Sequence, residues 1–261
     1  MSALGHYLED ERIPTVAISL IRLHSEMIRN PRTQWVPFEL GRPLGAPHEP
    51  EFQARVLKGA LSLLAAGPGP ALLTDFPDPA PGAGRDPSWR PPLVLPAADS
   101  DPAAAGNLTG HLTGHLLERL AERLRAEWQA VAPWYLRHRE ATGRTTAGAS
   151  GLPLPDCLEL VAAFVCGAPP ASPAPALPAV PAVQLLRFAV DDVKAGYLEA
   201  LSAGPGSPSS GQMQEWFWDT AAGRAIVALR AVLLASEDKR SQAIGRNCLV
   251  PRAQLERLGL A

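Results

Sequence analysis

The residue types best suited to hold a small polar ligand follow two apolar runs near the start of the chain. Arg22, His24 and Glu26 follow the first run, and Glu39, Arg42 and His48 lie at and beyond the end of the second. In open α/β sheets, ligands bind beyond the carboxyl ends of the strands, where such loops converge. We therefore expect a weak substrate pocket here, in which either arginine binds a carboxylate or another polar group. The alternative is a structural Glu39–Arg42 pair that fixes the shape of its loop.

The elements that position these residues form an α/β pattern. In chain order we expect the end of a helix at 1–12, strands at 13–21 and 33–40, a helix at 50–67 and an extended piece at 70–76. The first strand is β-branched and apolar, as in a buried parallel strand. The polar text between the two strands is interpreted as a connection. The predicted buried stripe of the helix consists of Phe52, Val56, Leu57, Leu61 and Leu64.

The stretch "WVPFELGRPLG" (35–45) combines rigidity with unusual backbone freedom. Pro37 and Pro43 stiffen it, and Gly41 and Gly45 permit positive backbone angles or a close approach of another group. We interpret this loop as one wall of a site whose reactive wall lies elsewhere.

The expected fold class is α/β, with a partial parallel sheet and flanking helices, followed by an all-α C-terminal region. The predicted domains are 1–76, a Pro- and Gly-rich linker at 77–108, and a helical domain at 109–261. Helices are expected at 109–140, 154–167, 183–204 and 211–240, with a proline-rich connector at 168–181. Two or three strands cannot form a parallel sheet that is covered on both faces. We therefore expect either that a partner chain completes the sheet or that further strands lie upstream of Met1.

Composition excludes several function classes. The formal net charge is −2, which gives no electrostatic reason to expect nucleic acid or acidic membranes as partners. No signal peptide or membrane-spanning run is recognised. The three cysteines, Cys157, Cys166 and Cys248, form no CxxC pair, so we expect neither a disulfide framework nor a metal site, and a cytoplasmic location. Cys157 and Cys166 are expected to be buried thiols in one apolar helix.

Three features of the helical region have a chemical and a structural interpretation. His111 and His115 share a helix face that can hold a metal, but a third ligand cannot be named, so an exposed pair is favoured. The turn "TGRTTAGASG" (142–151) offers backbone amides to an anion, although a plain inter-helix turn is favoured. The aromatic residues Trp216, Phe217 and Trp218 are expected in the core, with Gly223 allowing a close helix approach.

The first part of the chain resembles the glycine/sarcosine/betaine reductase selenoprotein B family, which includes D-proline reductase-like proteins. The resemblance rests on the phrases "LGHYLEDERIPTVAISLIR", "PRTQWVPFELGRPLG" and "EFQARVL". The resemblance is dense over about residues 3–80. Later phrases such as "EWFWDTAAGR" are similar to a helical extension of some relatives. The resemblance implies a bacterial oxidoreductase component that binds a small amine or amino acid.

In that family the redox centre is a selenocysteine or cysteine cluster in the turn just before the helix equivalent to "SALGHYLE". This chain starts at that helix, and none of its cysteines falls at a matching position. The resemblance therefore implies no catalytic residue and no cofactor here; what carries over weakly is the pocket wall of Arg22, His24, Glu39 and Arg42. We expect either an upstream in-frame segment that encodes the cysteine turn, or a short relative. The competing hypothesis is a non-catalytic partner subunit or homo-oligomer that completes another chain's sheet.

Overall fold

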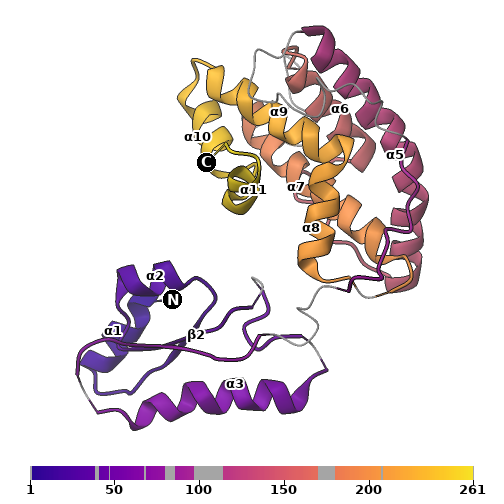
Figure 1. Cartoon of the computed structure of the whole chain (residues 1–261). Helices are drawn as coiled ribbons and strands as arrows, with labels where there is room; N and C mark the ends of the chain where they lie inside the picture. Colours follow the sequence, from indigo (N-terminus) through magenta and orange to yellow (C-terminus); the bar gives the residue numbers. More distant parts are fainter. Residues whose placement is uncertain are drawn as a thin grey trace. The chain divides into compact units, whose positions relative to one another are not determined.

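The computed structural model describes residues 2–38, 41–46, 48–67, 69–79, 86–96, 114–169, 180–206 and 208–260. The chain divides into two compact units, residues 1–85 and 86–261, and each is described by itself (Figure 1). The first unit holds a small parallel sheet with flanking helices, and the second is helical. This is the fold class expected from the sequence.

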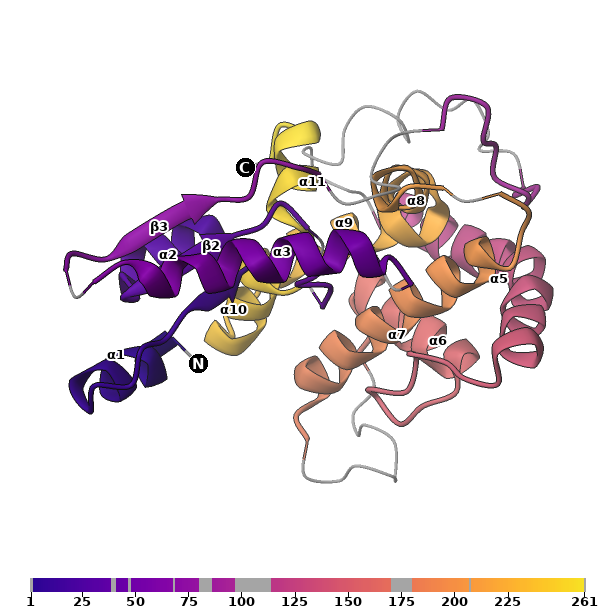
Figure 2. The same ribbon diagram turned by 90° about the horizontal axis from the view of Figure 1, so that it is seen from below.

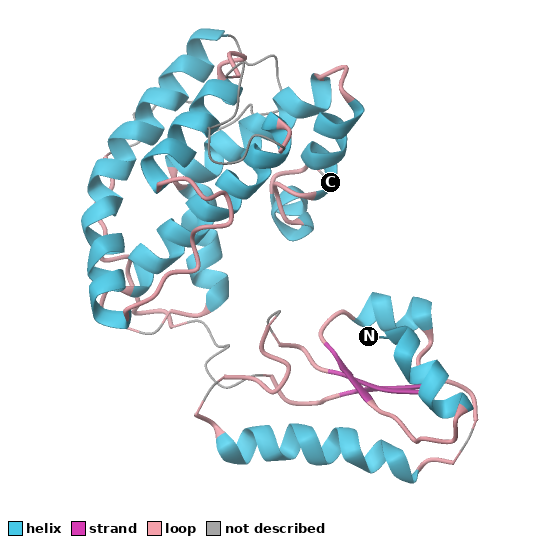
Figure 3. Cartoon of the chain, turned by 180° about the vertical axis from the view of Figure 1, so that it is seen from behind, coloured by secondary structure: helices cyan, strands magenta, loops and turns pink. Residues whose placement is uncertain are grey.

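The elements of the α/β unit follow in the order helix, strand, helix, strand, helix, strand. They are α1 (Ser2–Asp10), β1 (Ala17–Ser19), α2 (Arg22–Ile28), β2 (Arg32–Trp35), α3 (Pro50–Ser62) and β3 (Leu72–Asp75). The three strands are parallel and lie in the order β1-β2-β3, so β2 is central. In Figure 3, α3 lies along one side of these strands and α1 and α2 lie on the other.

Side chains of the α/β unit confirm that its helices lie on opposite faces of the sheet. Ile18 and Leu20 pack toward a buried cluster on the α3 face, made of Val36, Phe38, Phe52, Val56 and Phe76. Ser19 points to the other face, where its hydroxyl group accepts a hydrogen bond from Ser25 of α2 at 2.6 Å. The ring centroids of Phe38, Phe52 and Phe76 lie 5.5–5.9 Å apart in tilted or edge-on contacts.

Three predictions for this unit were wrong in detail. The polar text after the first strand forms α2 rather than a connection, and both strands are shorter than expected. Along α3 only Phe52, Val56 and Ala60 are buried, whereas Leu57 and Leu61 are 45 and 48 % exposed. Leu64 lies in the short 3-10 helix that follows, η1 (Leu63–Ala65), and is 36 % exposed. The physical reason is that three strands are too narrow to cover more than one stripe of α3, so only side chains that recur every fourth residue are buried.

The glycines of the loop after β2 behave as predicted. Gly41 and Gly45 both have a φ of 88°. A Cβ atom added at Gly45 would lie 2.8 Å from Cε1 of Phe52, whereas one added at Gly41 would meet nothing within 4 Å. Gly45 therefore serves both backbone conformation and the packing of the aromatic cluster.

The helical unit contains α5 (Gly114–Thr142), α6 (Leu154–Val165), α7 (Ala182–Ser202), α8 (Ser210–Asp219), α9 (Ala221–Ala235), α10 (Lys239–Asn247) and α11 (Arg252–Arg257). Helices α5, α6 and α7 lie side by side, and α9 contacts both α5 and α6 (Figure 2). Phe217 and Trp218 are 1 and 5 % exposed, as expected for core aromatics.

The prediction of a single helix at 211–240 is wrong, because the helix is interrupted at Thr220. Thr220 adopts an extended conformation, and its hydroxyl oxygen accepts a hydrogen bond from the backbone N–H of Gly223, which caps α9. A Cβ atom at Gly223 would lie 2.4 Å from the backbone oxygen of Phe217. Gly223 thus permits the sharp turn between α8 and α9.

Part of the predicted linker belongs to the helical unit. Leu93 is buried in its core, and the backbone N–H of Asp86 donates to Oε1 of Gln212 at 3.0 Å. The rest of the linker beyond residue 96, and residues 170–179 of the proline-rich connector, lie outside the described residues. Among the described residues, no helix has the length and apolar character needed to cross a bilayer.

Candidate functional site

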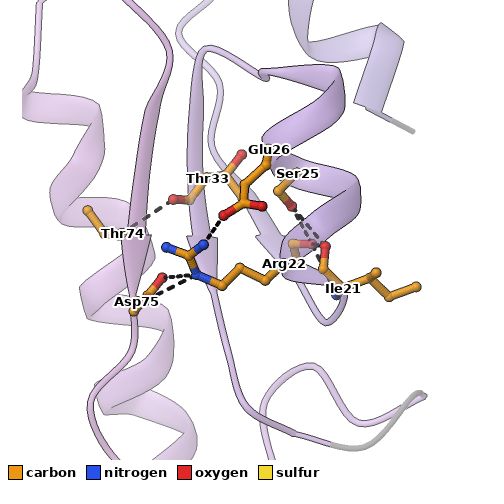
Figure 4. A network of polar contacts seen from close by, with 8 residues as sticks. Ile21, Arg22, Ser25, Glu26, Thr33, Thr74 and Asp75 are labelled. Atoms are coloured by element: carbon orange, nitrogen blue, oxygen red, sulfur yellow. Dashed lines mark hydrogen bonds and ion pairs between the residues drawn. The ribbon is translucent and has the colours of Figure 1, made fainter. Parts of the chain in front are cut away.

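A polar cluster occupies the carboxyl edge of the sheet. Arg22 begins α2 directly after β1, and its Nε donates to both carboxylate oxygens of Asp75 at 3.1 and 3.2 Å. Its Nη1 contacts the carboxylate of Glu26, one turn further along α2. Figure 4 shows Arg22 extending across the end of the sheet between these two carboxylates. The three side chains are 43–48 % exposed, so this cluster faces solvent.

The charge balance of this cluster decides which ligand group it suits. Two carboxylates, Glu26 and Asp75, surround one guanidinium group, so the cluster is net negative at neutral pH. Arg22 is already engaged by both acids and is therefore poorly placed to bind a ligand carboxylate. The exposed faces of Glu26 and Asp75 suit a ligand cation, such as an ammonium group.

The structure separates the other predicted site residues from this cluster. His24 is exposed and lines a groove along β1 instead. Arg42 is exposed in the loop after β2, where its backbone oxygen accepts a hydrogen bond from Gly45 at 2.9 Å. Glu39 lies outside the described residues, so the expected Glu39–Arg42 pair stays a prediction.

A groove along β1 forms an apolar concavity in the α/β unit. It has a volume of about 450 Å³, which lies within the roughly 300–1,000 Å³ range of ligand pockets. Leu4 and Leu8 of α1 line it together with the whole of β1. Asn30 also lines it, is 5 % exposed, and has a buried Oδ1 atom without a hydrogen-bond partner. The groove therefore combines apolar walls with one unused acceptor.

The cysteines, all in the helical unit, do not supply an evident nucleophile. Cys157 is fully buried, and this burial raises its pKa to about 11, so the thiol stays protonated at neutral pH. Cys166 is exposed, contrary to prediction, because α6 ends at Val165 and Cys166 only caps it. Cys248 is half-buried, and none of the three forms a disulfide.

The turn at 142–151 between α5 and α6, for which a plain connection was favoured over an anion site, binds the protein's own carboxylates. The carboxylate of Asp192 accepts hydrogen bonds from the backbone N–H groups of Gly148, Ala149 and Ser150 at 2.7–2.9 Å. Seven residues further along α7, Glu199 accepts hydrogen bonds from the hydroxyl groups of Thr145 and Thr146. These amides are thus already bound, and the loop is a structural connection rather than a site for an external anion.

A third buried carboxylate caps a helix in the same unit. Glu127 is 5 % exposed and accepts hydrogen bonds from the backbone N–H groups of Ala221 and Ala222 at the start of α9. Tyr197 donates its hydroxyl group to it at 3.0 Å. Burial raises the pKa of Glu127 despite these donors.

The histidine pair gives no metal centre within the described residues. His111 lies outside them, and His115 is exposed at the start of α5. Among the described residues, no group of three or more potential metal-ligand side chains lies together.

Trp216, the third aromatic of its motif, packs against the core, with its ring centroid 6.3 Å from that of Tyr197.

Sequence reasoning placed Glu26 after the first strand without assigning it to the site, and it missed Asp75 altogether. Glu26 lies four residues after Arg22, a spacing that indicates an ion pair once the segment is recognised as helical. Asp75 ends β3 and could be found only by aligning the ends of the three strands.

Comparisons with protein-family models, with curated proteins and with solved structures gave no match to this chain. The site is therefore interpreted from its own residues.

Proposed function

We propose that the chain is a cytoplasmic, oxidoreductase-family protein that resembles the substrate-binding B component of glycine, betaine or D-proline reductases and lacks its redox residue. The observation that supports this function is the Glu26–Arg22–Asp75 cluster at the carboxyl edge of a parallel sheet, the position where α/β proteins bind ligands. Its substrate class is a small amine or amino acid.

The electrostatics of the cluster favour the amine end of such a substrate. The carboxylates of Glu26 and Asp75 remain about half exposed while they hold Arg22. An incoming ammonium group finds two anionic acceptors beside one cation that is already neutralised. The cluster binds and orients the amine, and any electron transfer takes place on a group outside the residues of this sequence. The chain on its own is therefore a binding component.

Calorimetric titration with glycine, sarcosine, betaine and proline tests this function. We expect Asp75→Asn to weaken binding about fivefold, because an exposed ion pair contributes up to ~1 kcal/mol. Asp78→Asn is the matched control, since Asp78 is also about half exposed and pairs with an arginine, Arg55, at 3.2 Å. No saturable binding to the wild type, or equal affinities of the two variants, would reject the proposed function.

A second candidate function is that of a non-catalytic subunit that completes its sheet with another chain. The observation that favours it is β1, an edge strand bordered by an open apolar groove. Hydrogen exchange of the complex isolated from its native cells tests it. Amide protection at residues 16–20 that is lost when the chain is dissociated supports strand pairing with another chain. Equally fast exchange in the complex and in the dissociated chain rejects it.

A further inference from the structure

Three charged side chains form a stripe along α7 in the helical unit. Arg187, Asp191 and Lys194 are spaced by four and three residues, so they follow one another on one face of this helix. Nζ of Lys194 lies 3.7 Å from Oδ1 of Asp191. The stripe therefore places a guanidinium group, a carboxylate and an amine within two turns of one helix.

Lys194 has surroundings in which lysine side chains are seldom found. Its side chain is only 20 % exposed, and Nζ lies 5.8 Å from the ring centroid of Trp218, in the last turn of α8. Burial lowers the pKa of Lys194; Asp191 partly opposes this shift, and the neighbouring guanidinium group of Arg187 adds to it. A larger fraction of this amine is therefore neutral than in an ordinary lysine. A neutral amine is the nucleophile that attacks a carbonyl carbon.

Arg187 adds a cation that makes no ion pair within the described part of the chain. Its Cζ lies 5.6 Å from the ring centroid of Phe188, and its buried Nε has no hydrogen-bond partner there. Asp191 is already paired with Lys194. The three charges of the stripe thus leave one positive charge in surplus, which suits a ligand with one negative charge.

We propose that this stripe is a covalent binding site for a small carbonyl acid, a compound with one aldehyde or ketone group and one carboxylate. Lys194 forms an imine with the carbonyl group, and Arg187 binds the carboxylate through charge-assisted hydrogen bonds. Seven residues of α-helix rise about 10 Å, a gap that two long side chains and a ligand of a few carbon atoms span together. The site lies in the helical unit and does not depend on the proposed function of the α/β unit.

Imine formation at Lys194 balances without an oxidant or a reductant. The neutral amine attacks the carbonyl carbon, and the carbonyl oxygen leaves as water with the two protons of the amine. A C=N double bond to Nζ replaces the C=O double bond of the ligand. The carboxylate of Asp191, 3.7 Å from Nζ, is placed to carry these protons from the nitrogen to the oxygen.

Reductive trapping in the full chain tests the site. Cyanoborohydride reduces an imine to a stable secondary amine, which peptide mass spectrometry then locates. The probe is succinic semialdehyde, and butanal is its matched control, because both are four-carbon aldehydes and only the first carries a carboxylate. The chain contains three lysines, so Lys58 and Lys239, which are both exposed, serve as internal controls. We expect succinic semialdehyde to label Lys194 at least roughly fivefold faster than either of them.

Two arginine variants test the recognition of the carboxylate. In Arg187→Gln the preference of Lys194 for succinic semialdehyde over butanal should fall about fivefold, because one charge-assisted contact is lost. Arg230→Gln is the matched control and should keep the preference, since Arg230 is also half-buried in this unit and has a buried Nε without a hydrogen-bond partner.

Two results would overturn the proposal. One is labelling of Lys194 in the wild type no faster than that of Lys58 and Lys239. The other is a preference for succinic semialdehyde in Arg187→Gln that equals that of the wild type. Because the comparison of the three lysines uses the wild type, it stands even if a variant fails to fold.

Discussion

The two units of this protein treat their apolar side chains very differently. Among the described residues, nine of the eleven exposed large hydrophobic side chains belong to the α/β unit, although it is the smaller one. The described part of the helical unit encloses a continuous core and exposes two such side chains, Val94 and Leu136. It also holds three buried carboxylates, each with hydrogen-bond donors. The difference teaches that the helical unit is sufficient to bury its own core, whereas the α/β unit is built to be covered.

The largest effect is expected where the helical unit depends on one buried carboxylate. Asp192→Ala leaves three backbone N–H groups and the Ser150 hydroxyl group without their acceptor, so we expect a loss of about 4 kcal/mol in unfolding free energy. Chemical denaturation followed by tryptophan fluorescence measures this, because five of the six tryptophans lie in this unit. Asp191→Ala is the control, since the Asp191 side chain is about half exposed, at 43 %, and pairs with Lys194. Equal stabilities would contradict the role of the carboxylate.

Two neighbouring residues on α3, Val56 and Leu57, test which face of this helix is buried in the α/β unit. Val56 is fully buried, so Val56→Ala should destabilise this unit by about 2 kcal/mol. Leu57 is 45 % exposed, so Leu57→Ala should cost no more than ~0.5 kcal/mol. Hydrogen exchange of peptides from residues 30–60 measures both. If Leu57→Ala proves as damaging as Val56→Ala, the outer face of α3 is covered in solution.

The two glycines of the loop after β2 separate backbone strain from steric contact. Gly41→Ala should cost about 1 kcal/mol, the penalty of a side chain at positive φ. Gly45→Ala should cost about 2 kcal/mol, because the new methyl group also displaces the Phe52 ring. The difference in unfolding free energy of the α/β unit is the measured quantity. A larger effect at Gly41 would mean that the loop contacts something other than Phe52.

The smallest expected effect is an opposite pH dependence of the contributions of two carboxyl groups, Glu9 in the α/β unit and Glu127 in the helical unit. The N–H of Thr15 donates to Glu9 and lowers the pKa of this carboxyl group, so its stabilisation of the α/β unit is present above its ordinary pKa of 4.5 and is lost as pH falls. Burial raises the pKa of Glu127, so the helical unit gains stability from it at low pH and loses this as pH rises through the raised pKa.

Denaturation curves of the two units between pH 3 and pH 8, with Glu9→Gln and Glu127→Gln, measure these slopes. Glu9→Gln should remove a loss of stability of the α/β unit at low pH, and Glu127→Gln should remove a gain of stability of the helical unit at low pH. Each substitution should leave the other unit unchanged, and changes of the same sign in the two variants would contradict these assignments.

The sequence predicted the fold class and most helices, because apolar periodicity survives wherever one face is buried. It predicted Gly41, Gly45 and Gly223 correctly, since their conformations are local. It placed Leu57, Leu61 and Leu64 in the core wrongly, because periodicity records which side chains are apolar and not whether another layer is present. Asp75 was missed because its role depends on the alignment of strand ends more than fifty residues apart. The Arg22–Glu26 pair was missed because the segment after the first strand was interpreted as a connection rather than as a helix. The contacts of Asp192 and Glu199 are equally long-range and leave no local pattern.

The carboxylates of α7 also set an order of events during synthesis. The loop at residues 145–150 leaves the ribosome more than forty residues before Asp192 and more than fifty before Glu199. At about 5–20 residues per second, its amides wait for several seconds without their acceptors. Nascent chains arrested before residue 190 should therefore be cleaved in this loop by a protease, and chains released after α7 should resist it. One helix thus completes a connection that was translated well before it.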